Sequence, residues 1–159
     1  MKYALSIRIT ACLLFGLSMF VACGSDGKPG SANLKKLSVS SINSQFVENQ
    51  TSGRLFVISG LCINSSASGR RNIIVTGKLY TRGRKPFASE SAYVGNVLSD
   101  DNLQKQPIET IKERLNLKVP ENVVPAGGQD FFMIAFSNLP PLDTLDEFVV
   151  DVTDASTVQ

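Results

Sequence analysis

The alternation of apolar and polar residues after position 34 predicts a chain made mostly of short β-strands. Residues 55–64 and 129–137 are almost continuously apolar, which is typical of strands covered on both faces. In residues 147–153, Phe148, Val150 and Val152 are predicted to face inward and Glu147, Asp151 and Thr153 outward. Other strands are predicted over residues 37–47, where a bend or bulge is expected, and over 72–82 and 87–97, joined by a hairpin at 83–86. Short strands joined by turns indicate an antiparallel sandwich or barrel.

One stretch departs from the strand pattern and predicts one or two short inserted helices. Ser99 is a favourable N-cap, and the acids Asp100 and Asp101 suit the positive end of a helix. Pro107 fits the first turn of a second helix over Ile108–Leu115, whose apolar residues share one face. We expect these helices to cap an open end of the sandwich.

Residues 131–136 are apolar at both odd and even positions and include three phenylalanines. An exposed aromatic strip for binding is one interpretation. Because both faces are apolar, packing of a central strand inside the core is favoured.

The N-terminal region has the zones of a secretory signal. Lys2 and Arg8 accompany an apolar run over residues 9–21, and Ala22 then precedes Cys23. A single transmembrane anchor is the first alternative, but a bilayer needs about 20 apolar residues and this run is shorter and interrupted. An ordinary secretory signal with a soluble product is the second. The junction resembles the bacterial lipoprotein signal, although Phe20 stands where that signal usually has leucine.

The lipoprotein resemblance implies a domain organisation and a location. Residues 1–22 would be removed as a signal peptide, and Cys23 would be acylated and begin a flexible tether over residues 23–33. Ten residues of that composition span roughly 16–19 Å. The β-domain is expected over residues 34–155, with a tail at 156–159. Gly24 after the cysteine favours the outer membrane of the bacterial envelope, facing the periplasm.

Composition excludes several classes of function. Of 16 basic and 14 acidic residues, Lys2 and Arg8 leave with the signal, so the mature chain has no net charge. A nucleic-acid-binding protein would carry a basic excess. The chain has no histidine, the commonest general base, and Cys62 lies in an apolar strand typical of a buried thiol. We therefore predict no catalytic residue, no metal site and no cofactor.

The charges are unevenly distributed along the sequence. Residues 70–85 contain six bases and no acid, whereas residues 143–154 contain five acids and no base. These could be solvated hairpin tips and strand edges. Alternatively, the basic hairpin faces an anionic surface such as lipid headgroups, lipopolysaccharide or an acidic partner. The candidate residues are Arg70, Arg71, Lys78, Arg82, Arg84 and Lys85.

Two Asn-X-Ser/Thr sequences match the acceptor pattern for N-glycosylation. They begin at Asn49 and at Asn64. In a bacterial lipoprotein we interpret them as chance matches.

The mature domain also resembles a bacterial family of unknown function whose domain often follows a zinc ribbon and is related to FxLYD-type immunoglobulin-like sandwiches. The matching residues are Ile58-Ser59-Gly60 with Asn64, Gly77-Lys78-Leu79-Tyr80, Gly95-Asn96-Val97-Leu98-Ser99-Asp100, Phe132-Met133, Phe136-Ser137-Asn138-Leu139-Pro140 and Glu147-Phe148-Val149-Val150. Thr81 stands where the family usually has aspartate, and no CxxC pair of a zinc ribbon is present. The resemblance implies an immunoglobulin-like antiparallel β-sandwich and no particular activity.

Together these features predict a lipid-anchored envelope protein that acts as a non-catalytic binding or accessory module. The expected partners are the membrane, through the lipid, and an envelope protein or an anionic surface ligand; nucleic acid is not expected. A structural subunit or assembly factor of an envelope complex is the alternative. A hydrolase that works through carboxylates is the third hypothesis.

Overall fold

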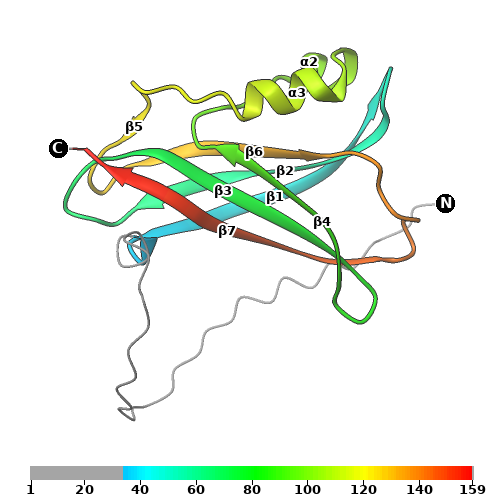
Figure 1. Ribbon diagram of the computed structural model, residues 1–159, viewed down its shortest axis with the longest axis horizontal. Helices are drawn as coiled ribbons and strands as arrows, with labels where there is room; N and C mark the ends of the chain where they lie inside the picture. The colour runs from blue at the N-terminus through cyan, green and yellow to red at the C-terminus, as the bar shows by residue number, and fades with distance from the viewer. Residues whose placement is uncertain (1–33, 159) are drawn as a thin grey trace, which may run out of the picture.

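The computed structural model describes residues 34–158, in which two antiparallel sheets pack face to face (Figure 1). Sheet A has the order β1-β2-β6, and sheet B has β3 at its centre with β4 and β7 on either side. The strands are β1 (Leu37–Asn49), β2 (Gly53–Asn64), β3 (Arg70–Thr81), β4 (Lys85–Tyr93), β5 (Val123–Val124), β6 (Gln129–Phe136) and β7 (Leu145–Thr157). The two helices are α2 (Asp100–Lys105) and α3 (Ile108–Leu115). The prediction of a mostly β antiparallel sandwich with short inserted helices is confirmed.

The core lies between the two sheets and is built from alternate residues of each strand. Phe56 is almost fully buried, and its ring lies 6.5 Å from that of Phe136 and 5.8 Å from that of Phe148 on the opposite sheet. Gly77 faces the same interior, where an added Cβ would meet the Phe136 ring at 3.1 Å. A residue without a side chain at that position therefore lets the two sheets approach closely.

Helix α2 contacts β1 and helix α3 contacts β6, so both lie against the outer face of sheet A, above β2 and β6 in Figure 1, and α3 also reaches β4 of sheet B. Val57 and Ala135 pair across β2 and β6 with their side chains on this outer face, yet both are buried. Leu103 of α2 and Ile111 of α3 are fully buried as well. The expectation that the helices cap an open end of the sandwich is therefore wrong, and their apolar faces explain instead why β2 is apolar on both sides.

Helix α2 begins as the sequence predicts. The Ser99 hydroxyl accepts from the backbone N–H of Asn102 at 3.4 Å and from its side-chain amide at 3.0 Å. Asp101 then pairs with Lys105 one turn later. These contacts account for the Ser-Asp-Asp sequence as a helix start, in agreement with the capping interpretation.

Three strands can be compared with their predictions in detail. The pairing of β1 with β2 shifts register after Ser40, and Ser41 has a φ of 50°, so the expected bulge is confirmed. Strand β7 continues to Thr157, so residues 156 and 157 belong to sheet B and not to a tail. Residues 132–136 of β6 are buried, so their predicted packing in the core is confirmed, but β6 is an edge of sheet A and not a central strand, and Phe131 is 60% exposed.

Each asparagine of the two Asn-X-Ser/Thr sequences is buried and hydrogen-bonds both to its own turn and to a distant segment. The Asn64 amide nitrogen is 3.0 Å from the carbonyl oxygens of Ser68, Val124 and Pro125, and its Oδ1 accepts from the Ser66 N–H. Asn49 repeats the arrangement at the β1–β2 turn, where its amide donates to two carbonyls of the α2 region and its Oδ1 accepts from the Thr51 N–H. The hydroxyl at the third position bonds Oδ1 in both, which explains the matches as turn chemistry.

The sandwich has two distinct ends, each formed by turns and by the termini of strands from both sheets. We call the end at which β1 begins the amino-terminal end; it lies at the left in Figure 1 and consists of residues 34–38, 63–71, 123–129 and 155–158. It is joined by backbone hydrogen bonds from Ser65 to Lys36 (2.8 Å), from Gly127 to Asn64 (2.8 Å) and from Val158 to Gly69 (3.0 Å). The hairpin end, at the right, consists of residues 49–54, 81–86 and 137–145.

Candidate functional site

The six basic residues selected from the sequence do not form one surface. Arg70 and Arg71 begin β3 at the amino-terminal end, Lys78 lies along the strand, and Arg82, Arg84 and Lys85 follow it at the hairpin end. A strand rises about 3.3 Å per residue, so the two groups of arginines are roughly 40 Å apart. A single anionic surface cannot contact all six at once.

Arg70 has a structural environment. It is only 4% exposed, its Nη1 donates to Thr157 Oγ1 at 2.5 Å, and its Nε donates to Ser66 Oγ at 3.2 Å. Its guanidinium therefore joins the β2–β3 turn to the end of β7. Arg71, in contrast, is exposed and lies opposite Val123 of β5 and Ser156 of β7.

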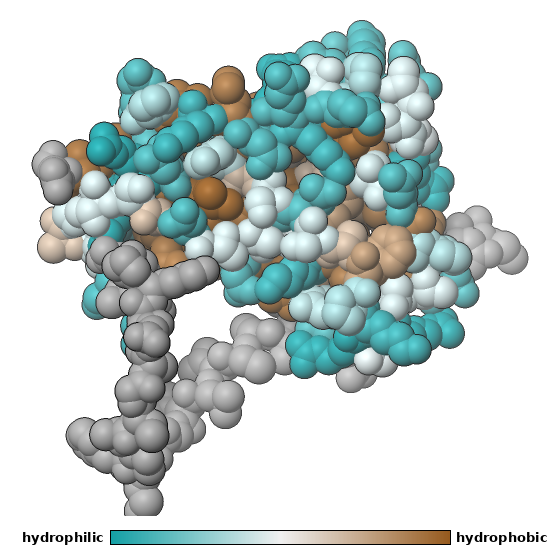
Figure 2. All heavy atoms as spheres, in the orientation of Figure 1, coloured by the Kyte–Doolittle hydropathy of each residue, from teal (hydrophilic) through white to brown (hydrophobic). Residues whose placement is uncertain are grey.

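At the hairpin end the bases lie beside acids. Arg84 Nε is 3.1 Å from Glu147 Oε2, and Arg82 Nη2 donates to the backbone carbonyl of Asp143 at 2.7 Å. Because β7 pairs antiparallel with β3, the acidic and basic segments of the sequence are neighbours in space. Figure 2 shows a hydrophilic surface over this tip, at the lower right. Its positive charge is thus partly balanced within the protein.

Lys78 lies on the outer face of sheet B, between Ser89 of β4 and Val149 of β7. It borders a shallow hollow of about 470 Å³ at the base of the hairpin, together with Tyr80 and Phe87. Phe87 is 42% exposed, so this hollow combines an ammonium group with accessible aromatic surface.

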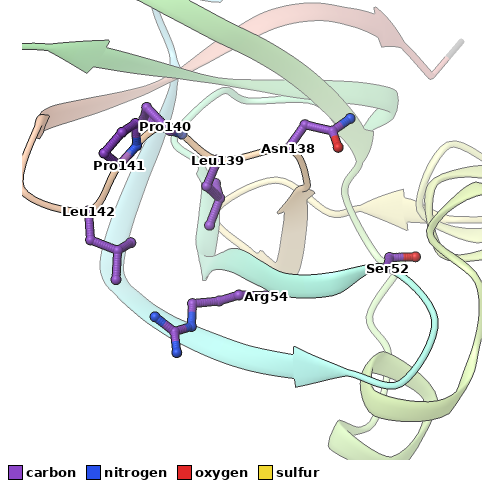
Figure 3. A pocket seen from close by; sticks show the side chains of 7 residues that line it. All are labelled: Ser52, Arg54, Asn138, Leu139, Pro140, Pro141 and Leu142. Carbon is purple, nitrogen blue, oxygen red and sulfur yellow. The ribbon is translucent and has the colours of Figure 1, made fainter.

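A second hollow at the hairpin end lies between the start of β2 and the loop that joins β6 to β7 (Figure 3). Its volume is about 460 Å³. Figure 3 shows Leu139 and Leu142 pointing toward Arg54 across this space. The residues that line it are Ser52, Arg54, Asn138, Leu139, Pro140, Pro141 and Leu142.

The loop that forms one wall of this hollow is stiffened by its sequence. Asn138 adopts a φ of 52°, two prolines follow at 140 and 141, and the Thr144 N–H and hydroxyl both donate to the Pro141 carbonyl (2.8 and 2.6 Å). Proline fixes its own φ and restricts the residue before it, so the wall is held in one shape. Sequence reasoning missed this hollow; the adjacent prolines were the only signal, and the opposing wall lies more than 80 positions away.

Cys62 is buried and free, as predicted. Burial raises the pKa of its thiol to about 11. The negative charge of Asp130, which pairs with Cys62 from the neighbouring strand β6, contributes in the same direction. The thiol is therefore protonated and inert at neutral pH. Among residues 34–158 no three potential metal ligands come together, and neither helix there is long and apolar enough to cross a bilayer. Cys23, the predicted acylation site, lies outside the described residues.

No family model matches the sequence, and comparison with curated proteins and with solved structures gives no significant match. The resemblance to the zinc-ribbon-associated family and its immunoglobulin-like sandwich therefore stays a prediction. What the structure contributes is a two-layer sandwich with hollows at the end opposite the point where the described chain begins.

Proposed function

We propose that this chain is a lipid-anchored protein of the bacterial envelope, attached through Cys23, whose sandwich is a non-catalytic module that binds a partner protein. The anchor is supported by the charged, apolar and small-residue zones that end at Cys23. The binding role is supported by the hollow between Arg54 and the loop over residues 138–142.

The position of that hollow carries the proposal. It lies at the hairpin end, whereas Leu37 begins β1 at the opposite end of a sandwich roughly 40 Å long. The tether predicted over residues 23–33 would span roughly 16–19 Å and would keep the amino-terminal end near the bilayer. The hairpin end then projects into the compartment, where a partner has access to it.

The lining of the hollow indicates what it binds. Leu139, Pro141 and Leu142 provide apolar contact on a rigid wall, Arg54 provides a guanidinium, and Asn138 provides an amide. Arginine beside apolar surface is typical of protein interfaces. We expect a polypeptide segment with an apolar side chain next to an acidic one.

Two measurements on the full-length protein in its native membrane test the proposal. Mass spectrometry of the mature N-terminus should show an acylated Cys23, and an unmodified Met1 would refute the anchor. A photo-reactive residue at Leu142 should crosslink to one protein partner, and the same residue at the exposed Glu113 on α3 should not. The Arg54→Glu substitution should abolish the adduct at Leu142. Equal crosslinking from both positions, or an adduct that survives Arg54→Glu, would refute a binding site in this hollow.

A further inference from the structure

The charges of the described domain are separated along its long axis. Residues 34–158 contain 13 basic and 13 acidic residues. The segments that form the amino-terminal end contain four of the bases (Lys35, Lys36, Arg70 and Arg71) and no acid. The hairpin end contains four bases (Arg54, Arg82, Arg84 and Lys85) and one acid (Asp143), so the excess of acids lies in the middle of the domain, which has five bases and 12 acids.

The exposed bases of the amino-terminal end lie on two segments that meet at the turn beginning with Ser65. Lys35 and Lys36 are exposed, and the Lys36 carbonyl accepts from the Ser65 N–H at 2.8 Å. The turn that begins at Ser65 leads directly into Arg71, which is exposed as well. Arg70 is not part of this surface, because it is buried against Ser66 and Thr157.

Apolar side chains accompany these bases. Val123 is 40% exposed and lies directly opposite Arg71 in the β3–β5 pairing, so the two side chains share a face. Ala67 and Ala126 are exposed in the neighbouring turn and loop. A cation next to small apolar groups suits the headgroup region of a bilayer, where the charge meets phosphate and the apolar part meets the acyl boundary.

We infer that the amino-terminal end of the sandwich docks on anionic phospholipid headgroups of the membrane that holds Cys23, through Lys35, Lys36 and Arg71. This inference rests on the proposed lipid anchor, because the predicted tether of roughly 16–19 Å would keep this end within reach of the headgroups. Docking of the amino-terminal end directs the acidic middle of the domain and the hairpin end away from the bilayer. The lipid surface thereby sets the orientation in which a partner meets the hollow at Arg54.

The hairpin bases are a poorer fit to the same surface. Arg84 is paired with Glu147, Arg82 is bonded to the Asp143 carbonyl, and Asp146 lies in the same segment. These acids would approach the headgroups together with the bases. The hairpin end therefore supplies a matched control for charge-reversal experiments.

The test uses the mature acylated protein, reconstituted in phosphatidylcholine vesicles with and without phosphatidylglycerol and with a headgroup-linked quencher. A fluorophore is attached at Ala67→Cys at the amino-terminal end or at Gln50→Cys at the hairpin end; both positions are exposed, and Cys62 is buried and does not compete. The Ala67 probe should be quenched strongly on anionic vesicles and weakly on neutral ones, and salt should weaken the effect. The Gln50 probe should be quenched little on either.

Charge reversal then separates docking from anchoring. Each basic residue near an anionic surface changes the docking equilibrium by about fivefold, so Lys35→Glu, Lys36→Glu and Arg71→Glu together should shift it by more than about 100-fold. The matched triple variant Arg82→Glu, Arg84→Glu and Lys85→Glu should shift it by less than about tenfold. Quenching of the Ala67 probe that is equal on neutral and anionic vesicles, or equal loss in the two triple variants, would overturn the docking. An unacylated Cys23 in mass spectrometry would overturn the anchor instead.

Discussion

The side chain of Asn64 is expected to make a large contribution to stability, which an Asn64→Ala variant measures. The residue is fully buried, and its two amide hydrogens serve carbonyl oxygens of Ser68, Val124 and Pro125, each 3.0 Å away. The Ser68 and Pro125 carbonyls keep a second donor, the Ser66 hydroxyl at 2.8 Å and the Gly128 N–H at 3.0 Å, so in the alanine variant the loss falls mainly on the Val124 carbonyl and the Ser66 N–H. A buried polar group without a partner costs about 1–3 kcal/mol, so we expect a loss of about 3–5 kcal/mol in the free energy of unfolding. That is a large share of the total of a typical domain.

The assay is urea unfolding at neutral pH, followed by far-ultraviolet circular dichroism because the chain has no tryptophan. Asn49→Ala is the matched comparison, since the Asn49 side chain makes equivalent hydrogen bonds at the other end of β2. Its replacement should lower the free energy of unfolding by about as much. A loss below about 1 kcal/mol for Asn64→Ala would refute the reasoning, because it would mean that the Val124 carbonyl and the Ser66 N–H are satisfied without the Asn64 side chain.

An Asn64→Asp variant sharpens the test through its pH dependence. A carboxylate cannot donate to the three carbonyls, whereas a protonated carboxyl group can donate to one, so the folded state should raise the pKa of the new Asp. A raised pKa means that stability is highest at low pH and is lost as pH rises through the folded-state value. Relative to the unmodified protein, the variant should therefore be less destabilised at pH 4 than at pH 7. Asn43→Asp, at an exposed position on β1, should show no such difference.

Three further predictions concern the core. Burial raises the pKa of Cys62 from 9.0 to about 11, so the free energy of unfolding should fall by roughly 2–3 kcal/mol as pH rises through this interval. Urea titrations of Cys62→Ala should show a smaller fall, and an equal fall would contradict the prediction. Gly60→Ala should lower the free energy of unfolding by about 1–3 kcal/mol in thermal or urea unfolding, since its Cβ would lie 2.9 Å from the Phe132 ring and from the Ser40 carbonyl. An unchanged stability would show that the backbone of the sheet shifts to accommodate the methyl group. Leu103→Ala, at a fully buried position of α2, should lower the free energy of unfolding by about 2–5 kcal/mol. The sandwich strands should stay protected from hydrogen exchange. Loss of protection in β3 and β7 would show that the helix is required for the whole fold.

The location of the candidate surfaces shows where sequence reasoning was insufficient. The basic segment over residues 70–85 was recognisable, but antiparallel pairing places acids of β7 beside it and buries Arg70. The hollow near Arg54 was not recognisable, because its walls come from β2 and from the loop after β6. Lys35 and Lys36 were not recognised as part of a basic end of the domain, because only the hydrogen bond from Ser65 to Lys36 places them beside the turn that leads to Arg71.

The sequence by itself predicted six of the seven strands that the structure describes, the two helices and the burial of Cys62, because local alternation, capping residues and apolar runs respond to the nearest few positions. It missed β5, and the strand predicted over residues 87–97 ends at Tyr93. It also carries the predicted signal and acylation site, which depend on a short contiguous segment. Only the tertiary structure decided that the helices cover the outer face of sheet A, that β6 is an edge, and that the acidic residues of β7 lie beside the basic residues of β3 and the hairpin. These outcomes depend on which strands pair and in what register, and pairing joins residues far apart in the chain that no local pattern connects.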